Sequence, residues 1–458
     1  MKKKQQKNKF LALLLYLLPI LFFIISYFLI TTSGEDVHQG AGNLRNGVEI
    51  NAIDDMTNAF KHSGRITDMY AWSVIDLFDY QYQFGIDTIF RIIDVILISG
   101  SFYLATFIIL GRKPKLVIKD ALVFCSTFVA VIFSMFGRRL YTEFSMIHNY
   151  VPLVFVTLLF SIPYLKLMLH HYITEKPLLL SCLMLILGVI FGLSTTVTPL
   201  AFLATVVIYL IITRKNLPKF QVWFFTGLIG LIIGAAISLF LSSGIGDYTN
   251  NPIAAKNFDY ISLADFLQAP FQTAPRLLFH LVYNFGMLLL PLLVYFLAAV
   301  YFTESFRQVF TKHPFKNISP STKHLIIAFS LFIFIHTFAT IQIKTPPRIL
   351  IPAYFAGIIL IFKIFVPHIK SRLFAPTIIF LSVSAIILHT IFLSLYHTKA
   401  SAILEEIKSS PEESLCIDWS RNVADRVPVI NLSQEYLLID WGYPEPIYDK
   451  SVTICKDN

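Results

Sequence analysis

The sequence TTSGEDVHQGAGNLRNGVEINAIDDMTNAFKHSGRITDMYAWSVIDLFDYQYQFG, residues 31–85, lies between two long apolar segments and decides how the chain is arranged. Between residues 33 and 85 it contains eight acidic and three basic side chains, so it is too polar to lie within lipid. We therefore expect a large acidic loop at a membrane face. Apolar residues at helical spacing in 53–60 and 69–84 predict short interfacial helices, with aromatic side chains such as Tyr70 at headgroup depth.

The composition is that of an all-α polytopic membrane protein. Charged residues make up 14% of the 458 positions, against roughly 25% in soluble domains, and the mean hydropathy is +0.67. The net charge of +9 comes from short basic clusters between apolar runs, which is typical of loop topology and argues against nucleic-acid binding. Runs long enough to cross a bilayer predict eleven transmembrane helices, at 10–31, 88–110, 118–136, 148–166, 177–194, 198–213, 220–242, 277–302, 324–343, 349–366 and 376–396.

Charge placement predicts the orientation. The first apolar run is too long for a cleaved signal, and the five lysines before it favour a cytoplasmic amino terminus. The loops that this assigns to the inside carry 21 lysines and arginines, and the longer outer loops carry nine. This bias predicts a multi-pass cell-membrane protein with an outward acidic loop and an extracellular carboxyl terminus. The break at 192–199 could equally be a re-entrant turn.

The predicted domains are a transmembrane domain at 1–396, with its first outer loop at 33–87, and a cap at 397–458. This tail changes composition, with eleven acids, six bases and no apolar run of membrane length. A helix-like run at 400–409 followed by strand-like pieces indicates a small extracytoplasmic α/β cap. Its cysteines, Cys416 and Cys455, could pair as a disulfide in an oxidising compartment.

Acidic side chains of the first outer loop are candidates for proton transfer. Glu35 and Asp36 follow the first span directly, where a carboxylate can take a proton from an acceptor hydroxyl at the boundary between water and lipid. Asp54 and Asp55 could form a similar pair, but they better suit the amino end of a short helix, where carboxylates are stabilised.

Arginines on the outer side are candidates for binding phosphate. A guanidinium binds phosphate through two parallel hydrogen bonds, and these arginines oppose the overall charge bias, so a local anion would explain their placement. Contact with lipid headgroups or pairing with loop acids is the alternative for each. The candidates are Arg65, Arg138, Arg139 and Arg348.

Other classes of site find less support. The sequence contains no HExxH, CxxC, Walker A, GxGxxG or GxSxG motif, so it indicates no cofactor and gives no positive sign of a divalent metal. A transporter would place ionisable groups in mid-span and tends to show repeated halves. Here Arg91 and Asp94 lie near the outer end of the second predicted span, and no internal repeat is visible.

These features together resemble the GT-C superfamily of membrane glycosyltransferases. The resemblance rests on the cytoplasmic amino end, the acidic pair after the first span and the long first outer loop. More closely, the chain resembles a group of bacterial polytopic proteins near the Gtr-type glucosyltransferases. This resemblance rests on three short motifs: HSGRI with Gly64 and Arg65, HNY at 148–150 and GLSTTVTPLA at 192–201. The similarity covers the first six spans.

The resemblance implies a transferase that moves a sugar from a polyprenyl-phosphate carrier to a cell-envelope acceptor on the outer face, by inversion. The acceptor would be a glycolipid, a teichoic acid or a wall polysaccharide. Asp36 or Glu35 would be the base and the outer arginines would hold the donor phosphate, with Glu143, His148 and Asp55 as auxiliary candidates near the acceptor. A lipid-linked glycan polymerase or ligase, a flippase or transporter of envelope precursors, and a non-catalytic envelope protein remain alternatives.

Overall fold

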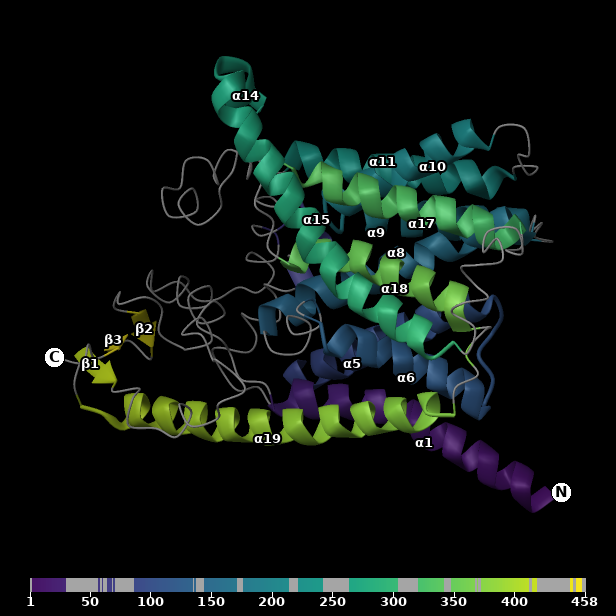
Figure 1. The fold of residues 1–458 in the computed structure, drawn as a ribbon. Coiled ribbons are helices and arrows are strands. Elements are labelled where there is room, and N and C mark those ends of the chain that lie inside the picture. Colours follow the sequence, from purple (N-terminus) through teal and green to yellow (C-terminus); the bar gives the residue numbers. More distant parts are fainter. Residues whose placement is uncertain are drawn as a thin grey trace.

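The computed structural model is almost entirely helical (Figure 1). It describes residues 2–29, 57, 60, 64–67, 69–70, 86–134, 136, 144–170, 176–213, 221–241, 263–303, 320–341, 347–366, 369, 372–411, 414–417, 445–447 and 450–454. The helices are α1 (Lys2–Leu29), α5 (Ile86–Leu110), α6 (Ile118–Ile132), α8 (Phe144–His170), α9 (Pro177–Gly192), α10 (Val197–Ile212), α11 (Val222–Leu241), α14 (Leu263–Gln268), α15 (Pro270–Tyr301), α17 (Pro320–Ala339), the 3-10 helix η2 (Pro347–Leu350), α18 (Ile351–Phe365) and α19 (Phe374–Ser409).

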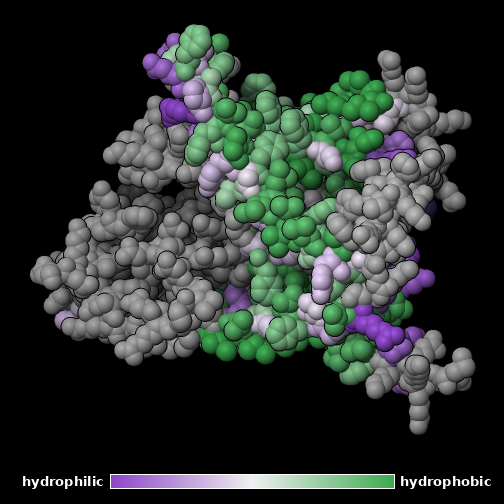
Figure 2. Space-filling model, viewed as in Figure 1, coloured by the Kyte–Doolittle hydropathy of each residue, from purple (hydrophilic) through white to green (hydrophobic). Residues whose placement is uncertain are grey.

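The chain is a multi-pass membrane protein. Among the described residues, seven helices are long and apolar enough to cross a membrane: α1, α5, α8, α11, α15, α17 and α19. Helices α9, α10 and α18 are shorter apolar helices, and α6 has 15 residues. A helix therefore occupies each predicted range, while the number that span the membrane stays a prediction. Figure 2 shows apolar side chains over most of the coloured surface, with hydrophilic residues gathered toward the edges.

Two ends of the bundle can be distinguished by their contacts. At one end α1 begins and α5 turns into α6, and we call this the amino end. There Arg112 donates to both carboxylate oxygens of Asp120 at 2.6 and 2.8 Å, which closes the turn between α5 and α6. At the other end α1 finishes beside the start of α5, and we call this the loop end.

The apolar core has two parts with α8 between them. One part joins α1, α5, α6, α15 and α18, and Val151 and Val154 of α8 pack into it. The other joins α9, α10, α11 and α17, and Phe160 and Tyr164 of α8 pack into that. Because α8 is shared, a residue near its loop end can contact α5 while the rest of the helix positions the second group.

Helices α9 and α11 approach closely along their lengths because glycines line their contact. A Cβ built on Gly230 would lie 2.3 Å from the carbonyl oxygen of Leu185, and one on Gly188 would lie 2.4 Å from that of Gly227. Backbones can approach this closely because the glycine at each contact has no side chain, as is common between helices in membranes. The pair therefore forms a rigid support for the turn between α9 and α10.

Helix α19 lies beside α1 and continues past position 397, so it includes the predicted helix-like run at 400–409 (Figure 1). Beyond it the structure describes three short strands, β1 (Ser414–Ile417), β2 (Glu445–Ile447) and β3 (Lys450–Ile454). Strand β3 is central, parallel to β1 and antiparallel to β2. Whether the tail is an extracytoplasmic cap, and whether its cysteines pair, remains a prediction.

Candidate functional site

A short segment of the loop between α1 and α5, residues 64–70, returns to the loop end of the bundle. We call it the bridging segment; position 68 lies outside the described residues. Its first residue, Gly64, has φ +66° and donates its N–H to the carbonyl of Phe60 at 2.7 Å. A Cβ at Gly64 would lie 2.4 Å from the carbonyl oxygen of Ser238, near the end of α11. Both the left-handed backbone and the close contact therefore require glycine here.

The middle of the bridging segment is attached to the turn between α9 and α10. The N–H of Ile66 donates to the carbonyl of Leu193 at 2.8 Å, and the hydroxyl of Thr67 donates to the carbonyl of Ser194 at 2.6 Å. Arg65 lies between Gly64 and Ile66, and it is half-buried. The backbone that presents this guanidinium is thus held on both sides of it, which gives an anion-binding side chain a defined starting point.

The last residue of the bridging segment, Tyr70, rests on charged residues of α5 and α8. Its hydroxyl donates to Oδ1 of Asp94 at 3.2 Å, and Oδ2 of Asp94 forms an ion pair with Nδ1 of His148. The rings of Tyr70 and His148 meet edge to face with centroids 5.6 Å apart. Asp94 and His148 are 0% and 1% exposed, so the pair is shielded from water. Tyr70 consequently links the bridging segment to α5 and α8.

Arg91 adds a guanidinium one turn before Asp94 on α5. It is buried, and its guanidinium donates to the carbonyl of Tyr27 near the end of α1. Charged groups in an apolar bundle are costly unless they are paired, and they are commonly found at functional sites. Burial, and next the nearby Asp94 carboxylate, raise the pKa of Tyr70 well above its usual value, so its hydroxyl stays a proton donor.

Two of the residues predicted from sequence fall within this arrangement. Arg65 lies on the bridging segment and His148 lies under its far end, so the structure brings the loop and the start of α8 together. Arg348 belongs to η2, and its side chain is outside the described residues. The remaining predicted residues, Glu35, Asp36, Asp55, Arg138, Arg139 and Glu143, also lie outside the described residues.

From the sequence, Asp94 and Arg91 were weighed only as marks of a transporter, and the depth of Tyr70 at the headgroups stays a prediction. In the structure Tyr70 and His148 both contact Asp94, and Arg91 lies one turn before Asp94 and donates to the carbonyl of Tyr27. The available signal was the presence of two ionisable residues three positions apart in an otherwise apolar span, since ionisable groups within a membrane usually have a named partner. The partner itself comes from another helix, and the sequence does not identify it.

A second polar group, made of histidine, threonine and asparagine side chains, lies between α10, α15 and α17. Thr198 Oγ1 and His336 Nε2 are 3.2 Å apart. Nδ2 of Asn284 donates to the carbonyl of Thr340 at 3.1 Å, and Nδ1 of His280 lies 3.2 Å from the carbonyl of Ile341. Thr198 lies in the first turn of α10, directly after the turn that holds the bridging segment, so the Thr198 end of this group lies near the segment.

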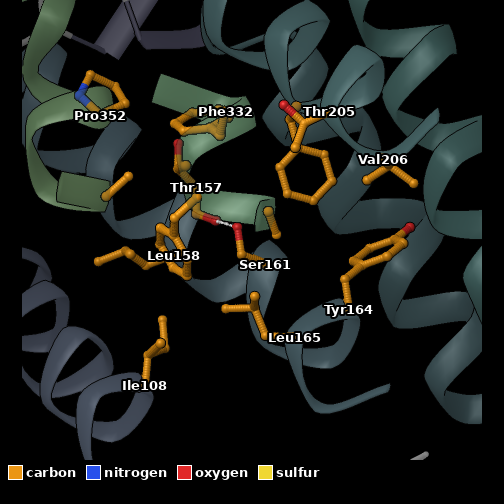
Figure 3. A pocket seen from close by; sticks show the side chains of 14 residues that line it. Ile108, Thr157, Leu158, Ser161, Tyr164, Leu165, Thr205, Val206, Phe332 and Pro352 are labelled. Carbon is orange, nitrogen blue, oxygen red and sulfur yellow. Dashed lines mark hydrogen bonds between the residues drawn. The ribbon is translucent and has the colours of Figure 1, made fainter. Parts of the chain in front are cut away.

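An apolar cavity of about 70 Å³ lies deeper in the bundle, between α8, α10, α17 and α18 (Figure 3). The hydroxyl of Ser161 donates to the carbonyl of Thr157, and that of Thr205 donates to the carbonyl of Ala201, so both are satisfied within their own helices. The cavity is therefore lined mainly by apolar side chains, and the protons of these two hydroxyls are not available to hydrogen-bond a ligand. Within the described ranges, no three His, Cys, Asp or Glu side chains are grouped closely enough to hold a metal ion.

No protein-family model, curated protein or solved structure matches this chain. The arrangement of its own residues is therefore what points to a function.

Proposed function

We propose that this protein is an inverting membrane glycosyltransferase that takes a sugar from a polyprenyl-phosphate carrier and transfers it to a cell-envelope acceptor. In this proposal eleven helices cross the cell membrane, the amino terminus is cytoplasmic and the loop end of the bundle faces outward. The acceptor is a glycolipid, a teichoic acid or a wall polysaccharide. The resemblance of the sequence to GT-C enzymes motivates the proposal.

One observation carries the proposal: the first loop folds back onto the loop end of an apolar bundle and holds Arg65 there on a fixed backbone. A lipid-linked phosphate has its isoprenoid chain in the bilayer and its anionic group at the end of the helices, which is the level of Arg65. A guanidinium is the side chain best suited to hold such a phosphate. Arg138, Arg139 and Arg348 are the other proposed phosphate ligands.

The proposed reaction needs one base and one cation. Asp36, or its neighbour Glu35, accepts the proton of the acceptor hydroxyl, and the resulting oxygen attacks the anomeric carbon. The bond between that carbon and the phosphate oxygen breaks, and polyprenyl phosphate leaves as an anion stabilised by arginine. A phosphate leaves without being protonated, so no acid is required on that side. The bridging segment is held at its far end by the contacts of Tyr70 with Asp94 and His148.

The test uses the full-length protein in lipid vesicles with radiolabelled polyprenyl-phosphate hexose and isolated envelope glycolipid, teichoic acid or wall polysaccharide. We expect Asp36→Asn to abolish transfer of label while leaving expression and donor binding unchanged. Arg65→Ala should weaken donor binding, and Arg65→Lys should restore it only in part because lysine cannot form two parallel hydrogen bonds. Normal transfer by Asp36→Asn would move the base to Glu35, Asp54 or Asp55, and no transfer by the unaltered protein to any acceptor would refute the proposal.

Transport of a lipid-linked precursor is the second candidate, and the buried ion pair of Asp94 and His148 favours it. Ionisable pairs inside a membrane often serve proton-coupled movement of a substrate. A transporter would move labelled polyprenyl-phosphate hexose between the leaflets of vesicles without consuming it. Asp94→Asn would stop that movement, and no labelled acceptor would form.

A further inference from the structure

Helices α10 and α17 contact each other through two histidine–hydroxyl pairs, and the two pairs differ. At the amino end, Nδ1 of His324 lies 2.8 Å from the hydroxyl of Tyr209, and His324 is half-buried. At the loop end, Nε2 of His336 lies 3.2 Å from Oγ1 of Thr198, and His336 is 0% exposed. The pairs join the same helices with the same chemistry, so any difference in their roles comes from their surroundings.

The second ring nitrogen of His336 sets the loop-end pair apart. Its Nδ1 is buried and has no hydrogen-bond partner among the residues that the structure describes. A neutral imidazole has one N–H and one lone pair, and leaving either buried and unsatisfied costs about 1–3 kcal/mol. Native proteins rarely retain such a group unless something else binds it.

A second group in the same condition lies on α11, which contacts α9 and α10. Oγ of Ser238 in α11 is also fully buried and lacks a partner within the described part of the chain. The backbone carbonyl of this same serine is the one that Gly64 approaches. The two unsatisfied groups therefore border the α9–α10 turn, His336 through Thr198 and Ser238 through the bridging segment.

From this placement we infer that His336, Thr198, Thr195 and Ser238 form a hydrogen-bonding subsite for the uncharged sugar ring of the lipid-linked donor. The inference rests on the proposed function and identifies the part of the donor that this side of the site binds. Imidazole and hydroxyl groups donate and accept hydrogen bonds without charge, which suits the hydroxyls of a neutral hexose. Thr195 already contributes its hydroxyl locally, accepting from the N–H of Thr198 at 3.3 Å.

The subsite lies next to the proposed phosphate ligand. Arg65 is two residues from Thr67, so their backbones are at most about 7 Å apart. Thr67 is bonded to the carbonyl of Ser194, and Thr198 follows on the same short stretch of chain. In the donor the phosphate is joined directly to the sugar. One molecule could therefore place its phosphate at Arg65 and its ring at the polar groups of α10, α11 and α17.

The test compares two probes, polyprenyl monophosphate and the same lipid carrying one hexose, with glucose, galactose and mannose tried separately. Binding to the full-length protein in nanodiscs is measured by microscale thermophoresis. We expect the unaltered protein to bind one hexose-bearing lipid about tenfold more tightly than the bare lipid, as one or two added hydrogen bonds would give. His336→Ala should remove this preference and leave the affinity for the bare lipid unchanged. Arg65→Ala should weaken binding of both lipids by the same factor.

His324→Ala is the matched control, because it removes the equivalent contact at the amino end of the same two helices. It should leave both affinities unchanged, and its melting temperature shows what loss of one α10–α17 contact does to stability. If His336→Ala fails to fold, Thr198→Val and Ser238→Ala take its place, and each should reduce the preference for the hexose.

The outcomes separate the two proposals. Equal binding of the bare and hexose-bearing lipids by the unaltered protein would overturn the sugar subsite alone. The sugar subsite would also be overturned if His336→Ala lost affinity for both lipids equally. It would be overturned as well if His324→Ala lost the preference for the hexose-bearing lipid as His336→Ala does. Failure of the unaltered protein to bind either lipid would instead overturn the proposed function, and the subsite with it.

Discussion

Replacing Gly64 with alanine tests whether the bridging segment is held as the structure indicates. The φ of +66° would cost a residue with a side chain about 1–2 kcal/mol. The new Cβ would also lie 2.4 Å from the backbone carbonyl oxygen of Ser238, and relieving such an overlap typically costs about 1–3 kcal/mol. The combined strain is roughly 2–5 kcal/mol.

The middle of this range of strain exceeds the free energy that holds the adjacent part of the segment. Two hydrogen bonds, from Ile66 and Thr67, attach it to the α9–α10 turn, and together they contribute about 1–3 kcal/mol. We therefore expect Gly64→Ala to detach this part of the segment while the apolar bundle stays folded. Arg65 would lose its fixed backbone, so binding of polyprenyl phosphate should weaken in parallel.

Hydrogen exchange followed by mass spectrometry measures the detachment. Because each 1.4 kcal/mol is tenfold in an equilibrium, exchange at Ile66 should become at least roughly thirtyfold faster, and peptides from α5 and α8 should not change. Gly111→Ala is the matched control: it has φ +68°, but its Cβ would meet only the flexible end of Lys363 at 3.1 Å. Unchanged exchange at Ile66 in Gly64→Ala, or equal acceleration throughout the chain, would refute the reasoning.

Three further predictions concern the packing around the site. Asp94→Asn should destabilise the protein by about 3–5 kcal/mol, because it removes one partner of a buried ion pair, and chemical unfolding of the variant in detergent measures this loss. Gly230→Leu should separate α9 from α11 and lower the melting temperature sharply, whereas Gly286→Ala, whose Cβ would meet nothing within 4 Å, should be neutral or stabilising by about 0.5–1 kcal/mol. Because the folded state raises the pKa of Tyr70, its contribution to stability is present below about pH 10 and is lost as the pH rises further, so Tyr70→Phe should flatten that alkaline decline in an unfolding titration.

Several features of the site could be anticipated from the sequence and others could not. Arg65 was identified because an arginine outside a span stands out against the charge bias, and His148 was a candidate through a short motif. The contact between Tyr70 and Asp94, and the pairing of Asp94 with His148, were not anticipated. These contacts join three segments that are distant in the chain, and hydropathy does not specify which helix faces which.

The sequence by itself determined that the protein is a multi-pass membrane protein, and it located each long apolar helix, because the hydrocarbon of a bilayer requires long apolar runs with internally bonded backbones. It also separated the polar first loop from the helices around it. Only the tertiary structure decided that Gly64 to Tyr70 return to the bundle, and that His336 and Ser238 border the same turn. The physical reason is that lipid solvates one apolar helix as well as another, so hydrophobicity alone does not select which helices pack together. Their rotations and neighbours are selected by close packing, such as that of the glycines in α9 and α11, and by the few polar groups that must find partners inside the bundle.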